Sequence, residues 1–286
     1  MSPRIRDIPI TKLNNGVEIP VFGLAIPKSF GDNNEVREVL VSAISLGYRL
    51  IDCAIFENEE KIGVALQQLI KEGKTKREDL FIIGKLYCSN PRSNLIKPAL
   101  ITTLEKLQTT YLDLYLIHQP AAFNDKNLIA VDFVNTWKAM EELYREKLTR
   151  AIGLSNFNSK QIECILKNSA VCPQVNQIEC HPYLNQARLR KYCSNNGITV
   201  ISYSHLDSSR NSIRPENPNV FDDSRIKKNA RRYNKTPIEI VLRYNLQLEN
   251  VVISESLIEN VNFFDFYIAP EDMSYIATFD CEEYNR

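Results

Sequence analysis

The sequence predicts a (β/α)8 TIM barrel with an N-terminal β-hairpin at the barrel bottom. Short apolar, strand-like runs alternate with helical segments along the whole chain, a pattern typical of a parallel sheet closed by helices. Polar residues follow these runs directly, and parallel strands present their C-terminal ends at one mouth of a barrel. Seven runs end in this way, at Asp52, Lys85, His118, Ser155-Asn156, Gln177, Tyr203 and Ser254-Glu255.

Length and composition support one barrel and exclude several classes of partner. The 286 residues suit a single domain spanning 1–286, because such a barrel needs about 250 residues and no linker-like stretch divides the chain. The 35 basic residues balance the 35 acidic ones, so we expect no nucleic-acid or membrane partner. Seven cysteines without metal-ligand spacing and only three histidines predict reduced thiols in a cytoplasmic protein, and no metal site.

The N-terminal elements can be predicted from local signals. Asn14-Asn15-Gly16 lies between the short runs 10–13 and 17–19, which predicts a hairpin with a type I′ turn. The first barrel strand is predicted at 21–26. The next helix is predicted over 35–46 and ends at Gly47, a typical residue at a helix C-terminus.

The later βα units follow at regular spacing. The remaining strands are predicted at 49–53, 81–85, 112–118, 151–156, 174–178, 199–203 and 250–254. Helices are predicted at 59–71, from 93, and at 133–145, 159–167, 185–194, 224–232, from 237, and at 270–279. Thr236 is the expected N-cap of the helix that starts with Pro237. A loop of about a dozen residues is expected before 133, and a long polar loop over 207–223.

Several strings in this order along the chain are similar to those of the aldo-keto reductase superfamily. They are GYRLIDCA at 47–54, YLDLYLIHQP at 111–120, IGLSNFN at 152–158, VNQIECHPY at 175–183 and FDF at 264–266. The chain resembles a divergent aldose- or aldehyde-reductase-like member. This resemblance covers essentially the whole chain, and it implies NAD(P)H-linked reduction of a carbonyl compound or the reverse reaction.

The resemblance implies four catalytic side chains, of which three are present. Asp52 and Lys85 match the pair that lowers the pKa of a proton-donating tyrosine, and His118 matches the residue that orients the substrate oxygen. The tyrosine is missing, because Phe56-Glu57 stands at its position and the spacing is one residue short. Tyr87 or Glu57 is a possible surrogate acid. The alternative is that Asp52 and Lys85 form only a buried ion pair at the barrel rim.

The cofactor side also matches in part. By resemblance, Ser155, Asn156 and Gln177 hold the nicotinamide carboxamide, and Tyr203 stacks on the nicotinamide ring. Leu206 and Ser208 are expected at the pyrophosphate. The alternative for each is structural: a turn and helix cap for Ser155-Asn156, and a core position for Tyr203.

The segment after the last strand departs from the family pattern. Glu255, beside Ser256, occupies the position of a lysine that grips the 2′-phosphate of NADPH, and the following segment that carries an arginine is shortened. A carboxylate repels a phosphate but can accept a hydrogen bond from a ribose 2′-hydroxyl. The resemblance thus implies NADP or NAD as the cofactor, and these departures predict weak or lost binding. Arg210 stands at the position of an aspartate that pairs with the lysine, so both charges of that pair are reversed.

Two functions remain open at this point. One is an oxidoreductase acting on a small-molecule carbonyl substrate, with standard catalysis impaired by the missing tyrosine and the missing 2′-phosphate grip. The other is a pseudoenzyme, a non-catalytic barrel used for binding, scaffolding or structure. For either function we expect a monomer.

Overall fold

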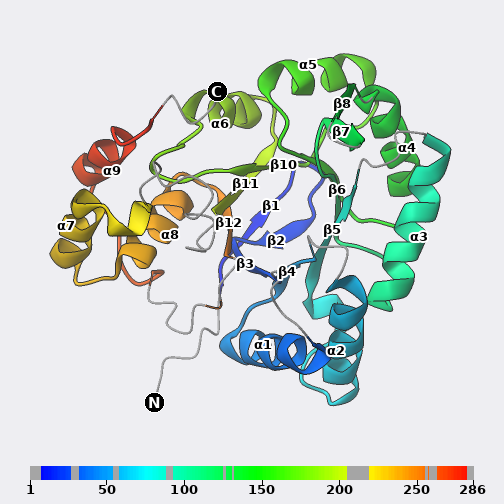
Figure 1. Ribbon diagram of the computed structural model, residues 1–286, viewed down its shortest axis with the longest axis horizontal. Helices are drawn as coiled ribbons and strands as arrows, with labels where there is room; N and C mark the ends of the chain where they lie inside the picture. The colour runs from blue at the N-terminus through cyan, green and yellow to red at the C-terminus, as the bar shows by residue number, and fades with distance from the viewer. Residues whose placement is uncertain are drawn as a thin grey trace.

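The computed structural model describes residues 8–26, 32–53, 58–87, 93–124, 127–130, 132–204, 219–254, 257 and 263–281. Eight parallel strands close into a barrel in the order β10-β11-β12-β3-β4-β5-β6-β9 (Figure 1), so the predicted fold class is confirmed. The barrel strands are β3 (Phe22–Ala25), β4 (Leu50–Asp52), β5 (Phe81–Leu86), β6 (Leu114–Ile117), β9 (Ile152–Ser155), β10 (Val175–Glu179), β11 (Thr199–Ser204) and β12 (Val251–Ser254).

The strands alternate between the barrel interior and the layer under the helices. On β6, Leu114 and Leu116 belong to the interior cluster, whereas Tyr115 and Ile117 pack in the outer layer. Because successive strand side chains point to opposite faces, the same parity directs the next inward position to His118. The interior positions of the other strands lead in the same way to Asp52, Lys85, Ser155, Gln177 and Tyr203.

Nine helices surround the barrel in the part of the chain that is described (Figure 1). They are α1 (Asn33–Leu46), α2 (Glu59–Lys71), α3 (Ile96–Leu107), α4 (Phe133–Arg145), α5 (Ser159–Asn168), α6 (Ala187–Asn195), α7 (Ser224–Tyr233), α8 (Pro237–Gln247) and α9 (Pro270–Ala277). Short 3-10 turns cover Arg77–Asp79, Ser93–Leu95 and Val220–Asp222. Local sequence explains the boundaries: Thr236 forms the capping box that starts α8, and Gly47, with φ of 99°, ends α1.

Aromatic residues cover part of the outer face after β12. Between β12 and α9, none of the described residues is helical. The ring centroid of Phe263 lies 4.7 Å from that of Phe22 on β3, and Phe264 lies 6.4 Å from Phe22. Gln247 of α8 holds this segment through two hydrogen bonds to the backbone of Ile268. The apolar surface of β3 is therefore covered by aromatic side chains at this point.

The N-terminal hairpin covers the end of the barrel at which the parallel strands begin. The type I′ turn predicted for this hairpin is wrong. β1 (Ile10–Lys12) pairs with β2 (Glu18–Pro20). Gly16 takes φ of 84° while Asn15 does not have positive φ, and Gly16 N–H donates to Leu13 C=O. This is a three-residue loop with glycine in the left-handed region rather than a type I′ turn. The Asn15 amide instead donates to the C=O of Arg150, which ties the hairpin to the barrel.

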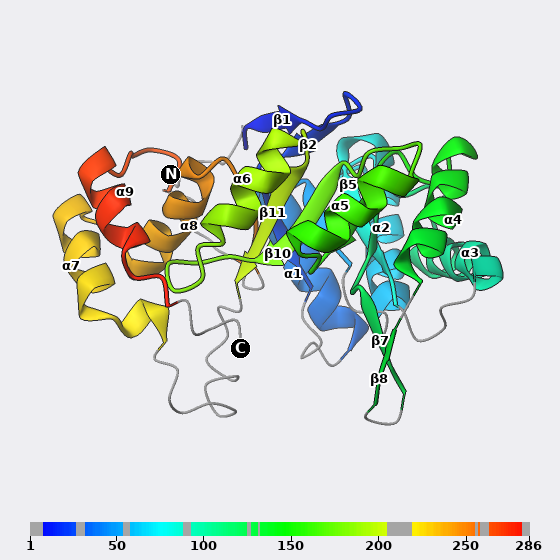
Figure 2. The ribbon, with the colours of Figure 1, turned by 90° about the horizontal axis from the view of Figure 1, so that it is seen from above.

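The stretch before α4, predicted as a loop, contains a second hairpin. β7 (Ala121–Asn124) pairs antiparallel with β8 (Asn127–Ala130). It projects from the side of the barrel opposite the β1–β2 hairpin (Figure 2). Within the described residues, no helix is long and apolar enough to cross a membrane.

Candidate active site

Side chains from six barrel strands meet at the C-terminal mouth. Asp52 ends β4, Lys85 lies near the end of β5 and His118 follows β6. Ser155 ends β9, Gln177 lies on β10 and Tyr203 on β11. Hydrogen bonds and one ion pair connect these residues, some directly and some through Asn156. The structure therefore brings together every described residue that the sequence assigned to the site.

Asp52 and Lys85 form a buried ion pair between neighbouring strands. Lys85 Nζ lies 3.3 Å from Asp52 Oδ2, and the two side chains are 7% and 2% exposed. The other carboxylate oxygen, Asp52 Oδ1, is buried without a hydrogen-bond partner. A buried pair of this kind adds little net stability, because desolvation of the two charges offsets their attraction. An ammonium group is thus held at the mouth by a single carboxylate oxygen.

His118 is held by its backbone on both sides and by an aromatic ring. Its N–H donates to Leu86 C=O at 3.1 Å, and its C=O accepts from Asn156 Nδ2 at 3.1 Å. The Tyr87 ring lies against the imidazole, with 4.7 Å between centroids and 40° between planes. Burial, and then the charge of Lys85, lower the imidazole pKa to about 4, with Asp52 acting in the opposite direction. The imidazole is therefore neutral near pH 7, with one N–H donor and one acceptor.

Asn156 connects the histidine to Tyr203. Its backbone has φ of 63°, in the left-handed region that asparagine tolerates better than most residues. Its Oδ1 accepts from the Tyr203 hydroxyl at 2.8 Å, and its Nδ2 also donates to Ser155 Oγ at 3.2 Å. A chain of hydrogen bonds thus runs from β11, through the residue after β9, to the backbone of His118.

Gln177 reaches across the mouth to the ion pair. Its Nε2 donates to Asp52 Oδ2 at 2.8 Å, and the side chain is fully buried. Gln177 Oε1 has no hydrogen-bond partner. The sequence assigned both residues to the site but did not indicate that they touch. Counting strands supplies the signal: the second and sixth strands of an eight-stranded barrel are opposite each other.

Gln177 Oε1 is a buried acceptor without a hydrogen-bond partner, so a nicotinamide group fits the site only if it offers a donor to this oxygen. A primary carboxamide carries an N–H donor for Gln177 Oε1 and a carbonyl oxygen for an amide or hydroxyl donor such as those of Asn156 and Ser155. The site residues therefore fit the group that the resemblance implies. The other predicted positions, Phe56, Glu57, Leu206, Ser208, Arg210, Glu255 and Ser256, lie outside the described residues.

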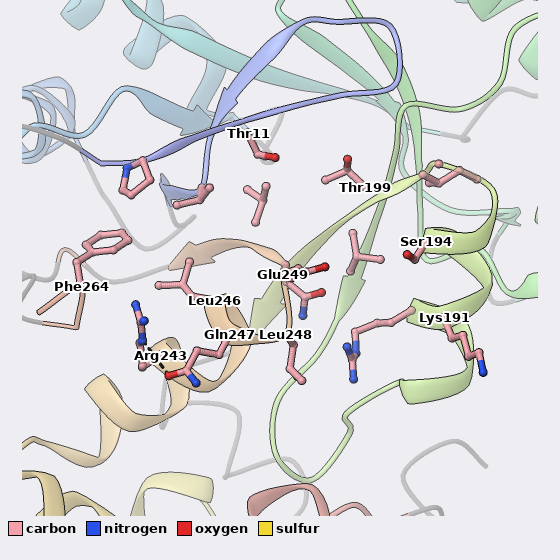
Figure 3. Close-up of a pocket in the computed structure, with 18 of the residues that line it drawn as sticks. Thr11, Lys191, Ser194, Thr199, Arg243, Leu246, Gln247, Leu248, Glu249 and Phe264 are labelled. Atoms are coloured by element: carbon pink, nitrogen blue, oxygen red, sulfur yellow. Dashed lines mark hydrogen bonds between the residues drawn. The ribbon is translucent and has the colours of Figure 1, made fainter. Parts of the chain in front are cut away.

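A groove of about 1010 Å³ lies at the other end of the barrel (Figure 3). Residues at the starts of β11 and β12 line it, together with α6, α8 and the β1–β2 hairpin. Arg243 and Gln247, joined by a hydrogen bond, stand on one wall, and Thr199 on another. It contains none of the site residues. In barrels of this kind the N-terminal face serves stability rather than chemistry, so we do not assign the reaction to this groove.

Within the described residues, no group of three or more His, Cys, Asp or Glu could hold a metal ion.

Comparison with known proteins agrees with the resemblance noted in the sequence. A model of the Aldo/keto reductase family matches residues 21–280. The chain is 41% identical to "Aldo-keto reductase family 1 member A1" of Gallus gallus, over 93% of this chain and 87% of that protein. It is 37% identical to "Prostaglandin F synthase 1" of Bos taurus, over 93% of this chain and 89% of that protein. The human protein named "Aldo-keto reductase family 1 member A1" is 39% identical, over 92% of this chain and 87% of its own length.

Proposed function

The chain belongs to the aldo-keto reductase family, and from this premise we propose that it binds a nicotinamide dinucleotide and catalyses carbonyl reduction or the reverse oxidation at a low rate. The observation that carries the proposal is the buried Asp52–Lys85 pair beside a neutral His118 at the mouth of the barrel. The proposed substrate is a small carbonyl compound. We also propose a monomeric, cytoplasmic protein, consistent with the described cysteines, all of which are free thiols.

Gln177, Asn156 and Ser155 would hold the carboxamide of the dinucleotide, and Tyr203 would lie against its nicotinamide ring. When bound, this group supplies a hydride to the carbonyl carbon. Glu255 in place of a lysine supports binding of NADPH that is no tighter than that of NADH, because a carboxylate repels the 2′-phosphate.

Side chains of this protein would orient the carbonyl oxygen of the substrate and donate a proton to it. The neutral imidazole of His118 can donate one hydrogen bond to that oxygen, and the Lys85 ammonium favours negative charge developing nearby. Tyr87 is our candidate for the proton donor, because its ring lies against His118 and it follows Lys85 by two residues. Glu57 is the alternative donor. It would have to hold its proton against the effect of a neighbouring lysine.

The missing tyrosine is the reason to propose a low rate. Loss of a positioned general acid typically costs about 10²–10⁴ in rate. The same absence supports the second candidate, a non-catalytic barrel that retains only ligand binding. The two candidates differ in turnover and not in fold.

Steady-state reduction of a simple aromatic aldehyde with NADH or NADPH tests the proposal. We expect slow turnover that Lys85→Met abolishes, and that Tyr87→Phe lowers by about tenfold or more without weakening dinucleotide binding. Rapid NADPH-dependent reduction by the unmodified protein would contradict the low rate. Turnover no higher than that of Lys85→Met would favour the non-catalytic barrel. Unchanged turnover in the Tyr87→Phe protein would show that Tyr87 is not the proton donor.

A further inference from the structure

Asp52 and Gln177 lie on diametrically opposite strands, yet their side chains touch. In the closed order of the barrel, β4 is four strands away from β10 in either direction. The 2.8 Å hydrogen bond from Gln177 Nε2 to Asp52 Oδ2 therefore spans the mouth. Both side chains are almost completely buried, at 0% and 2% exposure, so water does not compete freely for this contact.

The charge of Asp52 fixes which way the Gln177 amide faces. An ionised carboxylate can only accept hydrogen bonds, so the NH2 end of the amide must turn toward it. Lys85 Nζ lies 3.3 Å from the same carboxylate oxygen, so Asp52 Oδ2 is the acceptor in both contacts. The carbonyl end is left without a partner in a buried position, and Gln177 Oε1 is indeed an orphaned acceptor. The Asp52 carboxylate thus determines which end of the Gln177 amide is the nitrogen and which is the oxygen.

We propose that Asp52 is a positioning residue for Gln177, and that the Asp52 carboxylate makes this part of the site selective for a ligand carrying an N–H donor. This inference rests on the proposed function, in which the ligand is the primary carboxamide of a nicotinamide dinucleotide. It adds a second role for Asp52 beside its pairing with Lys85. The ion pair and the recognition of the cofactor are then coupled through one hydrogen bond.

Three dinucleotides distinguish an N–H donor from a carbonyl acceptor at this position. NADH carries the carboxamide, the thionicotinamide analogue keeps the NH2 group, and the 3-acetylpyridine analogue carries a methyl group in its place. An orphaned buried acceptor costs about tenfold in affinity. The unmodified protein should therefore bind reduced 3-acetylpyridine adenine dinucleotide about tenfold more weakly than NADH, and the thionicotinamide analogue about as tightly as NADH.

Asp52→Asn is the decisive variant, because an asparagine can offer either end of its own amide to Gln177. Both orientations of Gln177 then become available, so an acetyl group whose C=O is turned toward Gln177 can accept a hydrogen bond from Nε2. The preference for NADH over the acetylpyridine analogue should therefore fall to less than about threefold. Asp52→Ser, whose hydroxyl can also donate or accept, carries the same prediction if Asp52→Asn fails to fold. Gln177→Met removes the acceptor and should abolish the preference as well.

Ser202→Ala is the matched control, since this buried hydroxyl lies on the adjacent strand β11 and donates to Val251 C=O, away from the mouth. Affinities are read by fluorescence titration of folded protein, and circular dichroism verifies the fold. Loss of the preference in the Asp52 and Gln177 variants, with retention in Ser202→Ala, is the expected result. A folded Asp52→Asn protein that keeps the tenfold preference would overturn the inference but not the proposed function. An unmodified protein that binds the dinucleotides without any preference would do the same. If the folded, unmodified protein binds none of the three dinucleotides, the proposed function fails, and the inference fails with it.

Discussion

At the scale of single residues, the mouth depends on contacts between strands that are distant in the sequence. Inward positions such as Asp52 and Lys85 could be predicted, because polar residues follow apolar runs and strand parity fixes the face. The partner of Gln177 was not predicted, because it depends on closure of the barrel and on the reach of one side chain across it. The absence of a tyrosine at Phe56 and Glu57 also stays a prediction from the sequence, since both residues lie outside the described residues.

The imidazole of His118 should titrate far below an ordinary histidine. We expect an NMR pKa of about 4, because burial and then the Lys85 charge disfavour the imidazolium ion. The unfolded chain, with a pKa of about 6.5, binds more protons between these values. The free energy of unfolding should therefore fall as the pH drops from about 6.5 toward about 4.

Lys85→Met should raise the His118 pKa, whereas Lys74→Met, which changes an exposed ion pair with Glu72, should not move it. The three histidine signals can be assigned with His118→Gln. An ordinary pKa in the unmodified protein would show that the imidazole is more hydrated than the structure indicates.

Asn156 should contribute to stability through both its backbone and its amide. Asn156→Gly keeps the left-handed backbone but loses the hydrogen bonds to Tyr203 and His118, so we expect a loss of about 1–2 kcal/mol. Asn156→Ala should cost about 1 kcal/mol more, because alanine is strained in this region. Urea unfolding measures both values, with Tyr203→Phe as the variant that removes the hydrogen bond to Asn156 Oδ1 and keeps the Asn156 backbone. Equal stability of the glycine and alanine variants would contradict the backbone argument.

At the scale of elements, periodic helices were predicted most accurately. The boundaries of α2 and α4 match the prediction, because long amphipathic segments carry their own signal. Two turns were not predicted correctly: the three-residue loop after β1 and the β7–β8 hairpin. Local composition does not reveal the loop geometry that decides the pairing of such short strands. For the first turn it also does not reveal the hydrogen bond from Asn15 to the barrel.

Two glycines of the α2 region should respond differently to alanine. A Cβ at Gly63 would lie 2.1 Å from Lys106 O on α3, so Gly63→Ala must separate two helices. We expect a loss of about 1–3 kcal/mol or more. A Cβ at Gly73 would meet nothing within 4 Å, and the cost there is only that of φ near 70°, about 1–2 kcal/mol.

Thermal unfolding of both glycine variants makes the comparison. A Gly63→Ala protein as stable as the unmodified one would show that α2 and α3 can move apart without cost.

At the scale of the whole molecule, the structure shows the predicted barrel with Asp52, Lys85 and His118 at its C-terminal mouth. The absence of the proton-donating tyrosine stays a prediction from the sequence. Family membership and fold could be recognised from ordered strings, because these cover several strand ends at once. The level of activity could not, since it depends on the geometry of a proton donor and on the strength of cofactor binding together.

Restoring the tyrosine alone should therefore recover little activity. We expect Phe56→Tyr or Glu57→Tyr to raise NADPH-linked turnover only slightly, because we also expect the Glu255 carboxylate to repel the 2′-phosphate of the cofactor. Combining either change with Glu255→Lys should give more than the product of the single effects, measured as kcat/KM on a simple aromatic aldehyde. A single tyrosine substitution that restores full turnover would show that cofactor binding was never impaired.

The most direct test of the central claim, that the C-terminal mouth is a dinucleotide site, is isothermal titration of the unmodified protein with NADH and with NADPH. We predict saturable binding at one site per chain, weakened by Gln177→Met, with NADPH bound no more tightly than NADH. A tenfold preference for NADPH, or about 1.4 kcal/mol, would contradict the role of Glu255. The absence of saturable binding of either dinucleotide to folded protein would contradict the central claim itself.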